Sequence, residues 1–490
     1  MNMKINNRYL NNISNKLSYK DLIIFLIPFV IFMVYLYIFD PGILRPDTFN
    51  QFHQIATSTY GNWHPFFHTF IDMLCLMVYP DPKSIAILQI IIFSTIWASI
   101  CNYFRCDNET NDNEAFNKLF IIQIIFTTVI SLIPINALFS ITILKDTLFS
   151  YFLLLCCFLI KILLDKKGNV SYLFITTLSL SMAFVAQIRP NGLYLVLALI
   201  VCLFIYFYKT IKLKKVYVLI PVLTIIFILL IASLNVIYDV ENDQNDAIYT
   251  KVIHILGDYD LNLDLSSEDR DKIHELISEK DIERQYDKTF SDPIRNVGNR
   301  TVFNNDKVTY ISLAIKYSIK NPIHFVKYVF GSSPMVWKVV RDWTTSPYKT
   351  NIEHSKEYFL RTRNTTPIEG YEDVHIKNKG TEPYEQLNSF VLNVEENKIT
   401  DTLFDSPALY MYLSFILLAG IYLLTKSKDI FIVYLPNLLN ILIIFASTPI
   451  QDVRYLYPNL LLFYFLIIML LGILKKRKLE NEAGLIPDKK

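Results

Sequence analysis

Four short groups of polar residues interrupt a chain that consists largely of long apolar stretches. They combine carboxylates and cations with histidine and aromatic rings, side chains that can exchange protons and bind anions. The groups are residues 40–51 with Asn62-Trp63-His64-Pro65, then Lys145-Asp146, then Arg189-Pro190-Asn191-Gly192, and last Gln451-Asp452-Val453-Arg454-Tyr455. If the fold brings these groups together, they form one charged site.

Taken one at a time, these residues have ordinary interpretations. Asp47 can be a solvated carboxylate, and Lys145-Asp146 can be a surface pair. Arg189 can extend its guanidinium to lipid headgroups. His64 can be the first residue of a helix at a membrane interface. Whether the groups form a site therefore depends on whether they reach the same face.

The apolar stretches indicate the class of fold that must position these groups. Of the 490 residues, 52% are apolar and only 19% are charged. A bilayer core needs about 20 consecutive apolar residues in a helix. Ten windows fit this requirement: 21–39, 84–104, 118–133, 146–164, 170–188, 191–208, 216–238, 407–425, 430–446 and 455–474. We therefore predict an all-α polytopic membrane protein and exclude soluble, coiled-coil, collagen-like and nucleic-acid-binding proteins.

The basic residues predict how the spans are oriented, because short cytoplasmic loops are enriched in Lys and Arg. Ten crossings with both termini in the cytoplasm place every basic cluster inside. These clusters are Lys4, Arg8, Lys16 and Lys20; Lys161, Lys166 and Lys167; Lys209, Lys212, Lys214 and Lys215; Lys426 and Lys428; and Lys475, Lys476, Arg477 and Lys478. The 14-residue apolar run 66–79 would move some clusters outside if it crossed, so we predict that it lies in the interface. All four polar groups then lie on the outer face.

This topology divides the chain into five segments. They are a cytoplasmic N-terminus (1–20), spans one to seven (21–238) with the first outer loop at 40–83, an extracytoplasmic segment (239–406), spans eight to ten (407–474) and a basic cytoplasmic tail (475–490).

The extracytoplasmic segment differs in charge from the rest of the chain. It holds 29 acidic and 21 basic residues, a net charge of −8, whereas the remainder carries +10. Apolar periodicity predicts helices over 269–280, 307–319 and 323–330. Residues 344–400 show no pattern that predicts structure. We expect a mainly helical domain.

The polar groups also match a known family in order and in type. Pro46-Asp47-Thr48, Gln51 and Trp63-His64-Pro65 stand in the first loop, followed by Lys145-Asp146, Arg189 with Asn191-Gly192, and Arg454-Tyr455. On these residues the chain resembles the GT-C class of membrane glycosyltransferases, in particular a group of bacterial polytopic proteins with Pro-Asp-Ser/Thr, Gln and Trp-His-Pro in the first loop. The matches run from residue 40 to 458 and leave 239–406 almost uncovered.

The resemblance implies a function and a site. It implies sugar transfer from a polyprenyl-phosphate carrier to a cell-envelope glycan or polymer, with inversion, in a bacterial cell membrane, and interfacial helices in the first outer loop. It implies Asp47 as general base, with Arg189, Arg454 and Lys145 at the carrier phosphate. The remaining substrate-site residues would be Gln51, His64, Asp146, Asn191 and Tyr455. No cofactor is expected, and the first loop lacks the Asp-x-Asp pattern that accompanies a divalent metal in some members of the class.

Other functions fit parts of the same pattern. A transporter or flippase for lipid-linked sugars would use the same cations, but it predicts ionisable residues deep inside the spans. A polysaccharide polymerase or O-antigen-ligase-like enzyme has similar spans and a large outer loop. A metal-dependent hydrolase or transferase could use His53, His64, His68 and Asp47, since His64 and His68 are spaced i, i+4. A structural or receptor role requires none of this chemistry.

Cysteine accessibility tests the topology. We expect Lys83→Cys to react with a membrane-impermeant thiol reagent from outside the cell, and Asn169→Cys to react only from inside. The reason is that three predicted spans separate the two positions. The wild-type chain, labelled in parallel, gives the background from the native cysteines. Labelling on the reverse sides would contradict an outer location for the polar groups.

Overall fold

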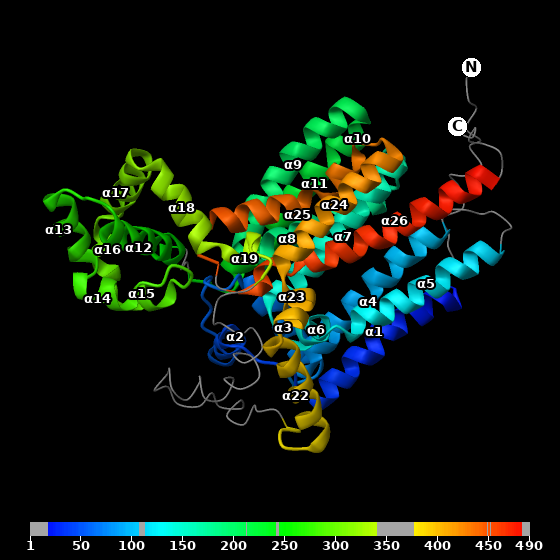
Figure 1. Cartoon of the computed structure of the whole chain (residues 1–490), viewed down its shortest axis with the longest axis horizontal. Coiled ribbons are helices and arrows are strands. Elements are labelled where there is room, and N and C mark those ends of the chain that lie inside the picture. The colour runs from blue at the N-terminus through cyan, green and yellow to red at the C-terminus, as the bar shows by residue number, and fades with distance from the viewer. Residues whose placement is uncertain are drawn as a thin grey trace.

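The chain folds into a bundle of long helices with a smaller group of short helices at one end (Figure 1). The computed structural model describes residues 18–106, 113–211, 213–241, 245–340, 377–447, 449–450 and 452–482. Within these ranges there are isolated β-bridges but no strand. The predicted all-α polytopic membrane fold is confirmed.

Each of the ten predicted spans coincides with a helix of the bundle. The helices are α1 (Tyr19–Ile38), α4 (Lys83–Cys106), α5 (Asn113–Leu132), α7 (Lys145–Asp165), α8 (Tyr172–Ile188), α9 (Pro190–Thr210), α11 (Leu219–Ile237, after the short α10, Lys214–Tyr217), α24 (Pro407–Thr425), α25 (Asp429–Ala446) and α26 (Pro458–Glu482). Among the described residues, eight helices are long and apolar enough to cross a membrane. Counting the bent pair α5 and α6 as one span gives nine, and α8 is apolar but shorter.

The first loop contains two helices, α2 (Pro46–Thr57) and α3 (Phe66–Val78). The α3 helix packs against α4, α8 and α11. The two ends of the first loop lie close together, because Lys83 Nζ is 3.8 Å from Asp40 Oδ2. The first loop therefore leaves and re-enters the bundle at the same end, and the run 66–79 within it is helical. Its location in the interface and the sidedness of the bundle remain predictions.

A buried helix that the sequence did not reveal follows α5. At Pro134 the chain bends by 68° into α6 (Pro134–Ile141), all of whose residues are buried. A segment of eight residues that begins with a proline carries too little periodicity to predict a helix. After α6, Ile43 N donates to Ile141 O at 3.0 Å and Ile143 N donates to Ile43 O at 3.1 Å. This pairing joins the start of the first loop to the segment that leads into α7.

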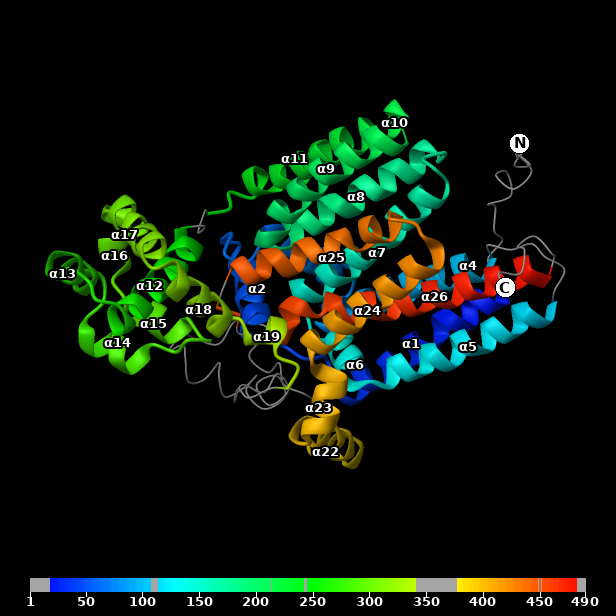
Figure 2. The ribbon, with the colours of Figure 1, turned by 45° about the horizontal axis from the view of Figure 1, so that its top comes forward.

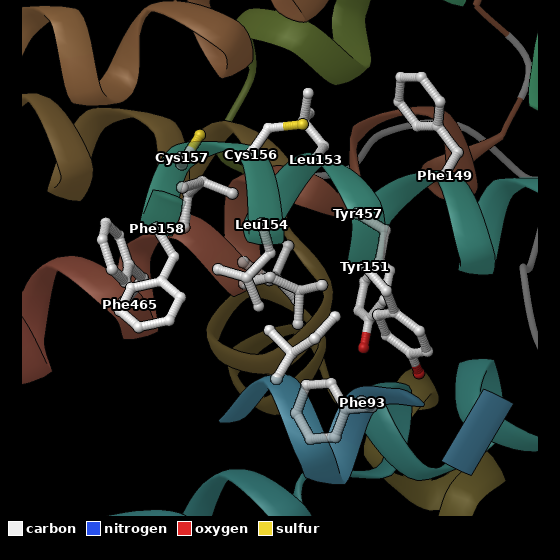
Figure 3. Packing of buried hydrophobic residues seen from close by; sticks show 14 of the residues in the cluster. Phe93, Phe149, Tyr151, Leu153, Leu154, Cys156, Cys157, Phe158, Tyr457 and Phe465 are labelled. Carbon is white, nitrogen blue, oxygen red and sulfur yellow. The ribbon is translucent and has the colours of Figure 1, made fainter. Parts of the chain in front are cut away.

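The most buried candidate spans are α7 and α26, which form the centre of the bundle. Figure 3 shows Phe93 of α4 and Tyr457 and Phe465 from the C-terminal region beside the side chains of α7. The rings of Phe93 and Tyr151 are 5.2 Å apart. Helices in lipid associate through such van der Waals packing and through interhelical hydrogen bonds. One such bond joins Trp97 Nε1 to Thr127 Oγ1 at 2.9 Å.

The short helices at the end of the bundle have a hydrophobic core of their own and are called here the helical subdomain (Figure 2). They are α12 (Asn245–Asn262), α13 (Ser267–Leu276), α14 (Glu279–Gln285), α15 (Asp292–Val297), α16 (Arg300–Asn305), α17 (Lys307–Lys320) and α18 (Pro322–Ser332), followed by α19 (Pro334–Trp337). The helices predicted over 307–319 and 323–330 correspond to α17 and α18. The single helix predicted over 269–280 is instead two, because Ser278 caps α14 by accepting a hydrogen bond from Asp281 N.

Part of the segment for which the sequence predicted no structure, residues 382–400, is helical. It contains α22 (Glu382–Glu396) and the start of α23 (Lys398–Asp405), whereas residues 344–376 lie outside the described ranges. Tyr384, Val391 and Val394 are buried, and the Tyr384 ring lies 5.4 Å from that of Phe39. Tertiary contact with Phe39, the residue directly after α1, therefore stabilises a helix whose apolar stripe is only three or four residues long.

A substitution at Gly42 tests the pairing between the first loop and the segment before α7. Its φ is +111°, and a Cβ atom there would lie 2.8 Å from Ile141 O. We expect Gly42→Ala to lower the free energy of unfolding by about 1–3 kcal/mol, the usual cost of a strained backbone position. The measurement is thermal or denaturant unfolding of the purified protein in detergent.

The matched control is Gly420→Ala, within α24, where a Cβ atom would meet nothing within 4 Å. Alanine is the better helix former, so this variant should be as stable as wild type or more stable. Equal stability of the two variants would show that the pairing at Gly42 does not constrain the fold.

Candidate functional site

Asp47 lies in the first turn of α2, where two cations from distant segments reach its carboxylate. Lys145 Nζ and Arg454 Nη1 each donate to Asp47 Oδ2 at 3.0 Å. The local sequence fixes the start of this helix. Pro46 occupies the first turn, and Thr48 Oγ1 accepts from Arg45 N at 3.1 Å while donating to Ile143 O at 2.6 Å. Asp47 is thus held opposite the beginning of α7.

His64 completes the surroundings of Lys145. The Lys145 ammonium donates to His64 Nδ1 at 2.7 Å, so the neutral imidazole carries its proton on Nε2. Burial, followed by the positive charge of Lys145, lowers the pKa of His64 to about 3. His64 is therefore an uncharged hydrogen-bond acceptor at neutral pH.

Arg189 is held between two aromatic rings and a carboxylate. Its Nε lies 2.9 Å from Asp146 Oδ1, and its guanidinium carbon lies 4.7 Å from the centre of the Tyr455 ring and 5.2 Å from that of Phe149. The residue is buried, and Nη1 has no hydrogen-bond partner within the described part of the chain. The position depends on the tight α8–α9 turn, because a Cβ atom on Gly192 would lie 1.9 Å from Val185 O. Arg189 thus offers a fixed donor to a further group.

Arg454 joins the two halves of the site from the short helix η2 (Val453–Leu456). Besides Asp47, its Nε lies 3.6 Å from Asp146 Oδ2 and 3.5 Å from Asp452 Oδ2. Its guanidinium carbon lies 5.1 Å from the centre of the Tyr455 ring, the same ring that contacts Arg189. One aromatic ring and one carboxylate are therefore shared by the two arginines.

The sequence did not assign a role to Arg45 or Asp452, although both belong to the site. Arg45 Nη1 lies 2.8 Å from Asp452 Oδ2, which ties the start of α2 to η2. Asp452 also caps η2 by accepting from Arg454 N at 3.0 Å. Their position in the sequence could have indicated this, since each stands two residues before a predicted site residue. The charged cluster comprises Arg45, Asp47, His64, Lys145, Asp146, Arg189, Asp452 and Arg454, with Tyr455 beside it.

Two of the predicted substrate-site residues do not join this cluster. Gln51 is buried between α2 and α3, where its Nε2 lies 2.9 Å from His68 Nδ1 and 3.0 Å from Thr69 Oγ1. It supports the helix that carries Asp47. Asn191 lies half-buried in the first turn of α9, and no hydrogen bond of its side chain to the cluster is seen in the ranges described.

The histidines considered for a metal site do not converge. His53 is exposed on α2, His64 binds Lys145, and His68 lies 3.2 Å from Asp72 Oδ2 on the other side of Gln51. Across residues 18–482, outside the gaps given above, no group of three or more His, Cys, Asp or Glu side chains could hold a metal ion. The donor arrangement therefore does not fit a metal shared by His64 and His68.

The electrostatics of the charged cluster favour an anion as its ligand. Burial by itself would raise the pKa of Asp47, but the charges of Arg454 and Lys145 outweigh it and hold this pKa well below the usual value. With His64 neutral, four cations face three carboxylates. Buried guanidinium groups recognise phosphate and carboxylate through bidentate hydrogen bonds. The arrangement can therefore accept an additional anion beside Arg189.

Replacing Arg189 by lysine separates charge from hydrogen-bond geometry. Because a hydrogen bond to a charged group contributes about 1.5–3 kcal/mol, we expect Arg189→Lys to raise the Kd for inorganic phosphate by about tenfold or more. Calorimetric titration of the purified protein measures this. The control is Arg270→Lys in the helical subdomain, where an Arg with a 42% exposed side chain pairs with Asp260. An unchanged Kd in Arg189→Lys would mean that the arginine only packs between its rings.

Comparison with known proteins places the chain in a family. Residues 84–484 match a family of unknown function, DUF6020. No curated protein and no solved structure matches the chain. The matched residues include Lys145, Asp146, Arg189 and Arg454 and begin after Asp47 and His64. Because the match covers more than half of the sequence, the chain belongs to the DUF6020 family.

Proposed function

We propose that this protein is a membrane glycosyltransferase of the GT-C type. It transfers a sugar from a polyprenyl-phosphate carrier to a cell-envelope glycan or polymer, and it inverts the anomeric configuration. It works without a cofactor, at the outer face of a bacterial cell membrane, with both termini in the cytoplasm. Its partners are the donor lipid, the acceptor and the surrounding membrane lipids.

The observation that carries this proposal is the convergence of Lys145, Arg189 and Arg454 at one end of an apolar bundle. The three cations come from segments more than 40 residues apart, yet they share Asp47 and Asp146 as partners. Arg189 adds a buried donor that has no partner among the described residues. A phosphate attached to a membrane lipid is an anion that reaches the end of such a bundle, whereas its polyprenyl chain stays among apolar side chains.

The same residues suit the chemistry of glycosyl transfer. An acceptor hydroxyl attacks the anomeric carbon, its proton passes to Asp47, and the bond between that carbon and the phosphate oxygen breaks. The phosphate then carries a second negative charge, which the arginines and Lys145 stabilise in a site largely removed from water. A fixed guanidinium is effective here because it does not have to reorganise as the charge develops.

Asp47→Asn tests the general base. We expect it to reduce sugar transfer by about 10²–10⁴-fold, the usual contribution of a general base. Turnover of purified protein with synthetic polyprenyl-phosphate sugars measures this, with and without a chelator to test metal dependence.

The control is Asp40→Asn, which removes a carboxylate at the same end of the bundle. Asp40 pairs with Lys83 and Lys377 and not with the charged cluster. Its effect should be small. Near-normal transfer by Asp47→Asn would reject Asp47 as the base, and the absence of transfer by the wild-type protein with any donor sugar would reject the function.

A further inference from the structure

Asp47 is paired in this structure with two cations that a phosphate would also use. Lys145 Nζ and Arg454 Nη1 approach the same oxygen, Asp47 Oδ2, at 3.0 Å each. The side chains are only 10–21% exposed, so solvent weakens these contacts little. The two cations stabilise the negative charge of the carboxylate through Oδ2, so the paired carboxylate is a weaker base than an unpaired one.

A phosphate bound at Arg189 would lie next to one of those cations. Arg189 and Arg454 lie against the same Tyr455 ring, and each contacts a different oxygen of Asp146. Arg189 Nη1 is buried without a hydrogen-bond partner in the described residues. An anion that binds Arg189 Nη1 is therefore a neighbour of the Arg454 guanidinium and competes with Asp47 for it.

The charges of the cluster leave room for one anion, and the shared cations make its binding an exchange. Four cations face three carboxylates, a net charge of +1, so a singly charged phosphate makes the cluster neutral. A phosphodiester such as a polyprenyl-phosphate sugar carries one negative charge, as Asp47 does. If the phosphate takes the place of the Asp47 carboxylate at Arg454 and Lys145, the number of close ion pairs stays the same. His64 Nδ1 remains a second partner for Lys145.

We propose that the phosphate of the donor displaces Asp47 from Arg454 and Lys145, and that this displacement makes Asp47 available as the base. The inference rests on the proposed function for its last step but not for the exchange itself. Without donor, Asp47 stays paired. With donor, the cations hold the phosphate, and Asp47 faces the acceptor hydroxyl as an unpaired carboxylate.

After the reaction, Asp47 returns to its paired state. The acceptor oxygen forms its bond to the anomeric carbon, the bond from that carbon to the phosphate oxygen breaks with its electron pair on the phosphate, and the hydroxyl proton moves to Asp47. When the polyprenyl phosphate leaves, Asp47 gives up the proton to water and pairs again with Arg454 and Lys145. The base is thus active only while a donor occupies the site.

The exchange predicts an increase in affinity on removing the catalytic carboxylate. We expect Asp47→Asn to bind geranyl phosphate and its methyl diester about fivefold or more tightly than the wild-type protein, because a competitor for close charge pairs is gone. Geraniol should show no change. Titration in detergent, without acceptor, measures this. Inorganic phosphate and phosphatidylglycerol, titrated in parallel, show whether a free phosphate or a bilayer headgroup has the same preference as the prenyl phosphate.

Asp40→Asn is the matched control, since it makes the same change of charge outside the cluster. Its affinity for geranyl phosphate should equal that of wild type. An unchanged or weaker affinity in Asp47→Asn would overturn the exchange, and so would an equal gain in Asp40→Asn, because the effect would then be one of net charge.

The pH dependence of the wild-type enzyme gives a second measurement that does not require Asp47→Asn to fold. The charged or titratable groups that face Asp47 are Lys145 of α7, Arg454 of η2 and the neutral His64. Release from the two cations weakens the stabilisation of the Asp47 carboxylate. The acid limb of kcat should therefore lie at higher pH than that of kcat/KM for the donor, which reports the free enzyme. Coincident limbs would contradict the exchange.

The two proposals fail in different ways. Tighter phosphate binding by Asp47→Asn in a protein that transfers no sugar would retain the exchange and reject the glycosyltransferase function. Sugar transfer that depends on Asp47, combined with unchanged phosphate affinity in Asp47→Asn, would retain the function and reject the exchange.

Discussion

Charge compensation at the end of an apolar bundle is the constraint on which this structure depends. Seven charged side chains meet there, drawn from segments around residues 45–47, 145–146, 189 and 452–454. Each would be costly to bury alone, since removing one partner of a buried pair leaves an uncompensated charge. The charges are compensated only while four helix ends stay together, those of α2, α7, α8 and η2.

The packing of the bundle makes that arrangement possible. The first turn of α7 provides Lys145 and Asp146, and the segment before α26 provides Asp452 and Arg454. These two helices form the most buried part of the bundle, so their ends are fixed by contacts along their whole length. The pairing of Ile43 with Ile143 then sets α2 against α7. Most residues of the site therefore stand at or next to the first turn of a packed helix.

The helical subdomain is connected to the site through the first loop. Asn62 N donates to Glu241 O at 2.9 Å, just before α12, and the Arg295 guanidinium carbon lies 5.5 Å from the centre of the Trp63 ring. His64 is the next residue. The segment that brings His64 to Lys145 thus also contacts the subdomain. This contact links the part of the chain that the family resemblance leaves uncovered to the charged cluster.

The sequence by itself determined the class of the fold, the positions of the long apolar helices and most residues of the cluster. Apolar windows of bilayer length leave few alternatives to helices, and charges at helix ends in such a protein are rare enough to notice. The short helices could not be predicted in this way. The α6 helix and α22 have brief apolar patterns, and they form because α1 and the rest of the bundle bury them.

Only the tertiary structure decided which charges pair. From the sequence, Asp47 could have been solvated, and Lys145 could have paired with its neighbour Asp146. In the structure Lys145 binds Asp47 and His64, and Asp146 binds Arg189. Gln51 lies behind the site, whereas Arg45 and Asp452 belong to it. Pairing depends on distances of 3–4 Å between residues up to 407 positions apart, and a linear pattern contains no such distances, because they follow from how the helices pack.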